Sequence, residues 1–565
     1  MNRSFTRISS PTLQVILKGV LLGFCLVCRT ILVLGQTETQ ADQVVITTLN
    51  QKTGVRTTEN GALQVNVSPA DVRAFKARGW VRYRDFGARG DGKTDDIDAI
   101  AGAHAFANQY GLPVRADAGA TYYIGGKERT AVIRTDTDFG TAAFLIDDTD
   151  VQNRNASVFL VSSGLQPFLL TGITSLKRNQ EKIEVSLPGP CLITVTNAHV
   201  KHYIRFGLNQ NNGAAQTDIF MVDRKGNVDM TAPIIWDFDQ ITDASALPID
   251  EKRLTIKGGR FTTIANKAES KYTYYNRNIA IKRSNVLVEG LEHRITGEGD
   301  QGAPYGGFLN IRDCAYVTVR NTTLTGHKTY STIGAAGKPV SMGSYDISAN
   351  RALNVSFINC RQTNDIDDRT YWGILGSNYC KNMLYDGCVF SRFDAHMGVA
   401  NATIRNSTLG HMGINAIGSG TLTVENSTIR GNTLINLRPD YGSTWQGEFV
   451  IRNCLFVPAG GRPSSAALIG GSYSGQHDFG YRCYMPERII IENLRIDDAN
   501  HPANYQGPAI FANINPQLAD DSYQEKFPYS ITREVILRNV TTASGKALRI
   551  SDNPFMFRQV NINVQ

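Results

Sequence analysis

Residues 402–406 read ATIRN and residues 422–426 read LTVEN, two copies of one short pattern. Apolar residues alternate in each copy, and Asn ends it. Eight further copies end in Asn or Gly: LTIKG (254–258), VLVEG (286–290), VTVRN (317–321), VSFIN (355–359), MLYDG (383–387), FVIRN (449–453), IIIEN (489–493) and VILRN (535–539). Alternation predicts a strand with one buried face. Successive copies end 19 to 46 residues apart, which predicts a chain that returns to one place on each turn.

We therefore predict an all-β fold, a right-handed parallel β-helix whose coils stack on one another. A single coil cannot bury its apolar side chains alone, so neighbouring coils share one core. Asn and Gly suit a tight corner because both tolerate left-handed backbone angles. Stacked Asn amides can also hydrogen-bond along the stack. A β-sandwich of short strands is the competing interpretation, but it does not explain why the corner residue is so often Asn.

Composition and charge exclude several classes of protein. The chain has 565 residues, of which 42% are hydrophobic and 19% are charged, so the bulk of it is globular and not disordered. The formal net charge is +7, from 58 basic and 51 acidic residues. This excess is too small for a nucleic-acid binder of this length, which would show a basic stripe.

The N-terminus predicts export. Arg3, Arg7 and Lys18 precede the apolar run 19–34, and small or polar residues follow it, as in a secretory signal peptide over residues 1–35. An uncleaved membrane anchor is the alternative, which Arg29 disfavours because it interrupts the apolar run. We expect a secreted, periplasmic or cell-surface protein with no membrane span after signal removal, and an N-terminal extension over residues 36–79.

Seven cysteines remain after the predicted signal, and none forms a CxxC pair. The odd number and the spacing argue against a zinc site and against a fully disulfide-bonded scaffold. Cys360, Cys388 and Cys454 directly follow corner residues. We interpret these three as buried thiols in one stack; a disulfide between neighbours is the alternative.

A helix is predicted before the repeats begin. Residues 95–109 are helical in pattern, with Thr94 or Asp95 placed as the N-cap and acidic residues in the first turn. Such a helix would cover the exposed end of the first coil. The β-helix domain is expected over residues 80–565. Within it, residues 126–250 show no regular coils and are expected to be an irregular or inserted segment.

The stretch before this helix carries a resemblance to a known family. DFGA-x-GDGKTDD (85–96), an Ala-rich helix and GATYYI (119–124) resemble the opening of the pectate-lyase-type, polygalacturonase-like β-helix superfamily, which includes phage tailspike depolymerases. The resemblance implies the fold and a polysaccharide or oligosaccharide substrate, but not the reaction, because the motif's role is to seal the first coil. A monomer or a homotrimer is compatible with it. The Arg-Gly-Asp triplet at 89–91 is interpreted as part of this structural turn.

Polar residues that follow the corners predict a catalytic ladder. In a β-helix, like positions on adjacent coils lie about 4.8 Å apart. Five residues lie five to nine positions past the corners of four consecutive coils: Asp365, Asp394, His396, His411 and Asn432. Glycoside hydrolysis needs two carboxyl groups, for which we expect Asp365 and Asp394, about 5 Å apart if the enzyme retains configuration. Asp367 and Asp368 would raise a neighbouring carboxyl pKa, and the two histidines would tune the acid or orient the substrate.

The remaining candidates would bind substrate. Trp372 and Trp445 are expected to stack on sugars, with packing under loops as the alternative. Arg392 and Arg438 would hold carboxylate or sulfate groups through a guanidinium fork, and Asn432 would add a hydrogen bond. No cofactor or metal is expected; a calcium ion at the acidic loop, or plain solvated charges there, is the alternative interpretation of Asp367 and Asp368.

Three functions follow from these residues. A glycoside hydrolase is favoured. TND (363–365), FDAH (393–396), GHMG (410–413) and Arg438 occur in an order similar to polygalacturonase sites, although Asp-Ala-His replaces paired Asp and no Arg-x-Lys follows. A polysaccharide lyase, acting by β-elimination on a uronic-acid polymer, is the runner-up. It would draw its base from residues such as Lys328, Arg361 and Lys381. The third candidate is a non-catalytic glycan-binding surface protein.

Overall fold

The structure is a computed structural model that describes residues 43–268, 274–299, 305–372 and 375–565. The predicted signal peptide lies outside the described residues. No helix in these ranges is long and apolar enough to cross a membrane.

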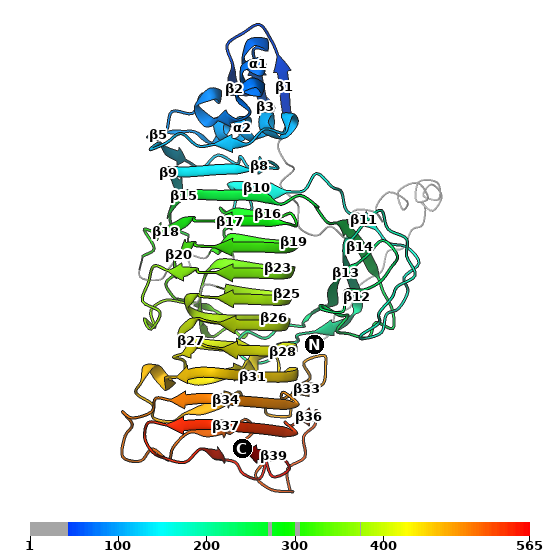
Figure 1. The fold of residues 1–565 in the computed structure, drawn as a ribbon, viewed down its shortest axis with the longest axis vertical. Helices are drawn as coiled ribbons and strands as arrows, with labels where there is room; N and C mark the ends of the chain where they lie inside the picture. Colours follow the sequence, from blue (N-terminus) through cyan, green and yellow to red (C-terminus); the bar gives the residue numbers. More distant parts are fainter. Residues whose placement is uncertain (1–42, 269–273, 300–304, 373–374) are drawn as a thin grey trace, which may run out of the picture. The chain divides into compact units, whose positions relative to one another are not determined.

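Most described strands belong to one extended, parallel, hydrogen-bonded system (Figure 1). Its members are β4 (Val81–Arg82), β5 (Asp91–Asp95), β6 (Val114–Arg115), β7 (Thr121–Ile124), β8 (Ala131–Ile133), β9 (Thr137–Asp147), β10 (Phe159–Ser162), β15 (Leu254–Ile264), β16 (Ile279–Lys282), β17 (Val286–Glu289), β18 (Glu292–Thr296), β19 (Gly306–Arg320), β20 (Thr323–Leu324), β23 (Tyr345–Ile358), β24 (Arg361–Gln362), β25 (Leu375–Asp386), β26 (Val389–Arg405), β27 (Thr408–Ala416), β28 (Gly418–Glu425), β29 (Thr428–Ile429), β30 (Thr433–Leu437), β31 (Trp445–Phe456), β32 (Ala467–Gly470), β34 (Arg488–Ile496), β35 (Ala509–Phe511), β37 (Glu534–Thr542), β38 (Arg549–Ser551) and β39 (Asn561–Val564).

The other described elements form smaller groups. They are the sheet of β1 (Val44–Thr48), β2 (Gly54–Thr57) and β3 (Leu63–Val67); the sheet of β11 (Phe168–Leu169), β12 (Cys191–His202), β13 (Ala214–Val222) and β14 (Asp243–Pro248); the pairs β21 (Tyr330–Ile333) with β22 (Pro339–Met342) and β33 (Cys483–Tyr484) with β36 (Tyr529–Ser530); the helices α1 (Pro69–Arg78) and α2 (Ile97–Tyr110); and the 3₁₀ turns η1 (Tyr83–Phe86), η2 (Pro439–Tyr441) and η3 (Pro458–Gly460).

The parallel pairings confirm the predicted β-helix and exclude the sandwich. In the coil 375–390, residues 375–378, 383–386 and 389–390 are three strand segments, each paired in parallel with neighbouring coils. The repeat copies align position by position, as residues 355–358 do with 383–386. In Figure 1 the coils follow one another in chain order, from cyan β9 to red β37. Chain connectivity therefore brings residues about one coil apart into hydrogen-bonded contact.

The corner residues behave as predicted. All ten repeat copies end in a residue with positive φ, such as Asn406 at 52° and Gly387 at 66°. Asn493 Nδ2 donates to Asn453 Oδ1 over 2.9 Å, and Asn539 Nδ2 donates to Asn493 Oδ1 over the same distance. The predicted amide ladder is thus present along this corner.

A second corner has the same chemistry, which the sequence analysis did not identify. Asn354, Asn382 and Asn401 also have positive φ. Asn382 Nδ2 donates to Asn354 Oδ1 over 2.8 Å, and Asn401 Nδ2 donates to Asn382 Oδ1 over 3.3 Å. Each coil in this region therefore turns twice on an Asn or Gly that accepts a left-handed conformation.

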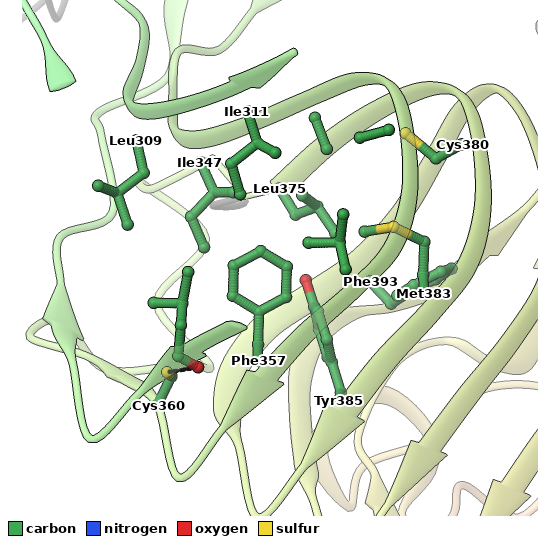
Figure 2. Close-up of a cluster of buried hydrophobic side chains, with 14 of the residues drawn as sticks. Leu309, Ile311, Ile347, Phe357, Cys360, Leu375, Cys380, Met383, Tyr385 and Phe393 are labelled. Carbon is green, nitrogen blue, oxygen red and sulfur yellow. Dashed lines mark hydrogen bonds between the residues drawn. The ribbon is translucent and has the colours of Figure 1, made fainter. Parts of the chain in front are cut away.

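The core lies inside the coils and is built by stacked side chains of like kind. Phe357 and Tyr385 occupy equivalent positions on successive coils, and their ring centroids lie 5.6 Å apart (Figure 2). Cys360 and Cys388 are buried there, and every cysteine in the described ranges is a free thiol. The prediction of buried thiols at these corners is confirmed.

The N-terminal part contains the predicted turn and helix, but the N-cap of the helix is Asp96 and not Thr94 or Asp95. Asp96 accepts hydrogen bonds from the backbone N–H groups of Arg89 and Gly90, over 2.7 and 2.9 Å, which fixes the turn that contains the Arg-Gly-Asp triplet. Asp95 accepts from the N–H of Ile97, the first residue of α2. α2 contacts β8 and the sheet of β1, β2 and β3. That it seals the first coil stays a prediction.

The segment 126–250 contains two different structures. Its first part is regular, because β8, β9 and β10 already pair within the β-helix. Residues 168–248 leave the coils and form an antiparallel sheet with a hydrophobic core of its own; we call this segment the lobe. Leu192 and Ile219 of the lobe pack against Ala315 and Leu353 on the outside of the coils. The lobe therefore covers part of the β-helix surface.

Candidate functional site

β26 carries three polar side chains on its outer face. Arg392, Asp394 and His396 alternate with Phe393 and Ala395, whose side chains are fully buried in the core. Successive side chains of a strand point to opposite faces, so the three polar residues share the face that points away from the core.

The polar face continues onto the next coils. Asp394 pairs in register with Asn415 of β27, which pairs with Asn436 of β30. Asn436 Nδ2 donates to Asn415 Oδ1 over 2.9 Å. Arg438 follows Asn436 by two residues and reaches back to Asp394. Residues from three coils thus meet on one surface.

Charged side chains of alternating sign form one chain of contacts, the arginine–aspartate cluster: Arg392, Asp394, Arg438, Asp440 and Arg205. Arg392 Nη2 contacts Asp394 Oδ2, and Arg438 Nη1 lies 2.6 Å from Asp394 Oδ1. Arg438 Nη2 lies 2.8 Å from Asp440 Oδ2. Arg205, from the β12–β13 loop of the lobe, places Nη2 2.6 Å from the same oxygen. The cluster therefore joins the lobe to the coils.

Burial and ion pairing act in opposite directions on these groups. Burial alone would raise the pKa of Asp440, but Arg438 and Arg205 outweigh it and hold that pKa well below its usual value. Burial would lower the pKa of Arg438, and Asp440 raises it instead. Burial lowers the pKa of Arg392 to about 10, which leaves it charged at neutral pH. Three arginines facing two aspartates leave one uncompensated positive charge.

His396 lies beside the cluster as a neutral imidazole. Burial and then the charge of Arg438 lower its pKa well below the usual value. Its Nδ1 lies 3.0 Å from Oδ1 of Asn378. An amide oxygen only accepts, so Nδ1 carries the proton and Nε2 keeps its lone pair. Within the described ranges no hydrogen bond reaches Nε2. The ring of Tyr441 meets the imidazole edge-on, with centroids 5.6 Å apart.

Two aromatic rings flank Arg392. Its guanidinium carbon lies 5.2 Å from the ring centroid of Trp372 and 5.9 Å from that of Tyr345, within the range of cation–π attraction. Trp372 donates its backbone N–H to the carbonyl of His327 over 2.8 Å. It lies against Gly343, where an added Cβ would come within 1.7 Å of the indole. This position of Trp372 therefore requires a glycine opposite.

The structure brings five of the eleven predicted site residues together: Arg392, Asp394, His396, Arg438 and Trp372. It adds five that the sequence analysis missed: Arg205, Tyr345, Asn378, Asp440 and Tyr441. Asp440 could have been found, because it lies two residues from Arg438. Arg205 carried no signal, since it lies in the lobe and outside the repeat.

The acidic residues 365–368, the aspartate loop, do not contact Asp394. Asp365 is exposed. Asp367 is ion-paired with Arg430 at 2.6 Å, and Asp368 Oδ1 accepts from the hydroxyl of Thr370. Among the described residues no hydrogen bond or ion pair joins Asp365 to Asp394, so the expected pair of adjacent carboxyl groups is not formed.

His411 and Asn432 also lie outside the cluster, because the true register differs from the predicted offsets. β27 carries two more residues than β26 between their paired segments, so Asn415, and not His411, lies opposite Asp394. His411 lies in this bulge and places Nδ1 3.0 Å from the carbonyl oxygen of Ile366. Asn432 is exposed before β30. Offsets counted from a corner cannot reveal an inserted bulge.

The prediction that Trp445 stacks on sugars is wrong. It is fully buried in the core, its Nε1 donates to the carbonyl of Gly420 over 2.9 Å, and its ring packs against Phe449. It has no exposed face on which a sugar could stack. The sequence could not distinguish it from Trp372, since both follow polar stretches that contain Asp and Tyr.

No metal centre is found in the part of the chain that the structure describes: no group of three or more His, Cys, Asp or Glu side chains is arranged to hold an ion. Calcium binding by Asp367 and Asp368 stays a prediction.

A separate polar cleft of about 350 Å³ opens next to the aspartate loop. Its polar side chains come from successive coils: Glu298, Lys328, Asn364 and Tyr371. Behind it, Glu298 Oε1 lies 3.3 Å from His327 Nδ1, and His327 Nε2 lies 3.1 Å from Asp346 Oδ1. Burial would lower the pKa of His327, but the two carboxylates outweigh it and raise that pKa to about 10. The histidine is therefore a buried cation that fixes both acids.

No model of a known protein family matches the chain, and no curated protein sequence matches it. Solved structures with similar folds include the tailspike gp61 of Pseudomonas phage phi297, with 13% identity, a TM-score of 0.48, and coverage of 82% of this chain and 80% of that one. The gp54 tailspike of Acinetobacter baumannii phage AP22, solved with a capsular saccharide, has 10% identity, a TM-score of 0.45, and coverage of 90% and 81%. The Streptococcus pneumoniae surface adhesin PfbA has 12% identity, a TM-score of 0.36, and coverage of 83% and 93%. At these values the function must be argued from this chain's own residues.

Proposed function

We propose that this protein acts on an acidic polysaccharide outside the cytoplasm and cleaves it by β-elimination at the arginine–aspartate cluster. The observation that supports this most is the pairing of one uncompensated positive charge with a neutral histidine whose Nε2 has no hydrogen bond to any residue that the structure describes.

The positive charge suits a uronate. Arg392 and Arg438 lie on the same outer face as His396, and each already holds an aspartate. The third guanidinium, that of Arg205, leaves the group with a net positive charge. A sugar carboxylate bound there would be neutralised, which weakens the bond between C5 and its hydrogen.

His396 supplies the base. Its Nε2 takes the C5 proton, the electron pair left on C5 forms the C4–C5 double bond, and the bond from C4 to the glycosidic oxygen breaks. The leaving oxygen takes a proton from solvent or from the nearby phenol of Tyr345. The low pKa keeps the imidazole unprotonated before substrate binds, and a substrate carboxylate would offset Arg438 and raise that pKa during proton transfer.

Asp394 supports hydrolysis less well than the sequence suggested. Its side chain is fully buried and each oxygen faces a guanidinium, so it is a fixed carboxylate and not a free acid or nucleophile. Glycoside hydrolysis is the second candidate, because Asp365 is exposed and a histidine lies near the same loop. The pKa of Asp368 is lowered mainly by hydrogen bonds from Thr370 and to a smaller extent by the charge of His411.

The test is digestion of polygalacturonate, alginate and hyaluronan by the purified chain, followed by reducing-end release and by ultraviolet absorbance of unsaturated products. We expect both signals to rise together, and His396→Ala to lower the rate about 10²- to 10⁴-fold. His199→Ala, an exposed histidine of the lobe, is the matched control. Reducing ends without absorbance, lost in Asp365→Asn and His411→Ala, would support hydrolysis. Binding without cleavage of these polymers would identify a glycan-binding protein.

A further inference from the structure

A cavity of about 370 Å³ lies between the lobe and the coils, and the reaction proposed above does not use it. Cavities of this size accommodate small ligands. The coils contribute small residues to its wall, such as Gly398, Ala400, Gly418 and Ser419. The small side chains at these four positions leave the cavity open, and larger side chains would fill it. At Gly398 an added Cβ would lie 2.1 Å from the hydroxyl oxygen of Tyr203.

Aromatic rings form one side of the cavity. Tyr203, Trp236, Tyr379 and Tyr481 line it. The ring centroid of Tyr203 lies 5.6 Å from that of Tyr379 and 5.2 Å from that of Tyr481, both edge-on. Trp236 is only half-buried and lies 5.8 Å from Tyr481 with the rings 32° apart. The imidazole of His202 also contacts Trp236, with ring centroids 4.4 Å apart, so a sugar ring would pack against the part of the indole that stays exposed in the pocket.

Charged groups form its floor and rim. Lys381 Nζ lies 2.8 Å from Asp218 Oδ1, and each side chain is only 1% exposed. Arg178 and Arg482 also line the cavity. Asp237 is the other acid there, and it is exposed. Three cations against two acids leave a net positive charge, which favours an anionic ligand.

The cavity is distinct from the arginine–aspartate cluster. Tyr203 lies between the two, because its ring contacts Tyr441 at 5.7 Å on the cluster side and Tyr481 on the cavity side. Of the charged residues in the cluster, none lines the cavity. A ligand bound in the cavity therefore does not contact the charged side chains of the arginine–aspartate cluster.

We propose that this cavity is a second carbohydrate site, which binds one or two residues of an acidic sugar. The ring stacks on Trp236 and Tyr481, and the carboxylate lies toward Arg178 and Arg482. Lys381 remains paired with Asp218 and contributes a fixed donor. The inference concerns binding alone and does not depend on cleavage at His396.

The test is titration of the full chain with galacturonate and digalacturonate, measured by calorimetry, with galactose and digalactose as neutral probes. Trp236→Leu and Arg482→Gln should each weaken uronate binding about tenfold. Arg224→Gln, an exposed arginine of the lobe outside the cavity, should leave it within twofold. Ser419→Phe, which fills the space from the coil side, should abolish it.

The outcome is separable from that of the proposed reaction. His396→Ala and Arg438→Ala should retain uronate binding at the cavity even where cleavage is lost. If neither uronate binds saturably to the folded chain, or if Trp236→Leu and Arg482→Gln leave the affinity unchanged, the second site is refuted. Equal binding of galactose and galacturonate would refute the role given to the cations.

Discussion

Arg438 Nη1 lies 2.6 Å from Oδ1 of Asp394, although 44 residues separate them in the chain. Asp394 is fully buried, and Arg392 holds its other oxygen. The aspartate therefore acts as the fixed centre of a charged network. Its carboxylate orients two guanidinium groups and, through Asp440, connects them to Arg205 of the lobe.

Asp394→Asn should destabilise the fold, because it leaves two buried guanidinium groups short of a negative charge. Removal of one partner from a buried ion pair costs about 3–5 kcal/mol in the free energy of unfolding. Denaturant unfolding measures this loss. Asp365→Asn, an exposed aspartate one coil earlier, is the matched control and should change stability by less than about 0.5 kcal/mol. Equal stability of the two variants would show that the pairing is not maintained in solution.

At Asn493 the contribution of the Asn ladder to stability has two parts, one from the backbone conformation and one from the amide hydrogen bonds. Its φ is 54°, and its amide joins those of Asn453 and Asn539. Asn493→Gly keeps the left-handed corner and loses only amide hydrogen bonds, each worth about 1 kcal/mol. Asn493→Ala also adds a left-handed strain of about 1–2 kcal/mol. Thermal unfolding should rank wild type above Gly and Gly above Ala. The opposite order of the two variants would mean that the corner conformation is not the constraint.

Trp445 and Trp372 should respond differently to truncation. Trp445→Ala removes a fully buried indole and its hydrogen bond to Gly420, so the free energy of unfolding should fall by about 3–5 kcal/mol. Trp372→Phe keeps a ring beside Arg392 and should leave the melting temperature nearly unchanged while it alters affinity for the polysaccharide. Calorimetric melting and binding on the same two proteins check this. A stable Trp445→Ala variant with weakened glycan binding would reverse the assignment.

His327 predicts how stability depends on pH. Its pKa is raised from 6.5 to about 10 by Asp346 and Glu298, so the folded chain holds a proton that the unfolded chain releases above pH 6.5. Its stabilising contribution is complete below pH 6.5 and is lost as the pH rises through about 10. The difference in unfolding free energy between wild type and His327→Gln should therefore shrink from pH 7 to pH 10. A constant difference over that range would contradict the buried cation.

Much of the fold could be predicted because it depends on local patterns. A corner Asn such as Asn406 or Asn426 predicts a left-handed backbone conformation at its own position. The alternation before it predicts which side chains face the core. The repeat therefore located the strands and one line of corners. The lobe was predicted only as an irregular or inserted segment without its bounds or its sheet, because its strands pair with each other and follow no period.

The site was only partly predictable, since its geometry depends on register. Asp394 and His396 were recognised as polar residues past a corner, and Arg438 was recognised as a candidate substrate-binding arginine. The bulge at His411 and the contact from Arg205 have no local signal. Burial also separated Trp445 from Trp372, and burial is a property of the surrounding coils.

The amino-acid sequence alone determined that this chain winds into stacked parallel coils, because alternation and corner residues act within a few positions of the chain. Only the tertiary structure decided which polar residues meet. Some contacts form between distant segments, as between Arg438 and Asp394 and between Arg205 and Asp440. The relative position of such segments along the stack of coils depends on every insertion between them.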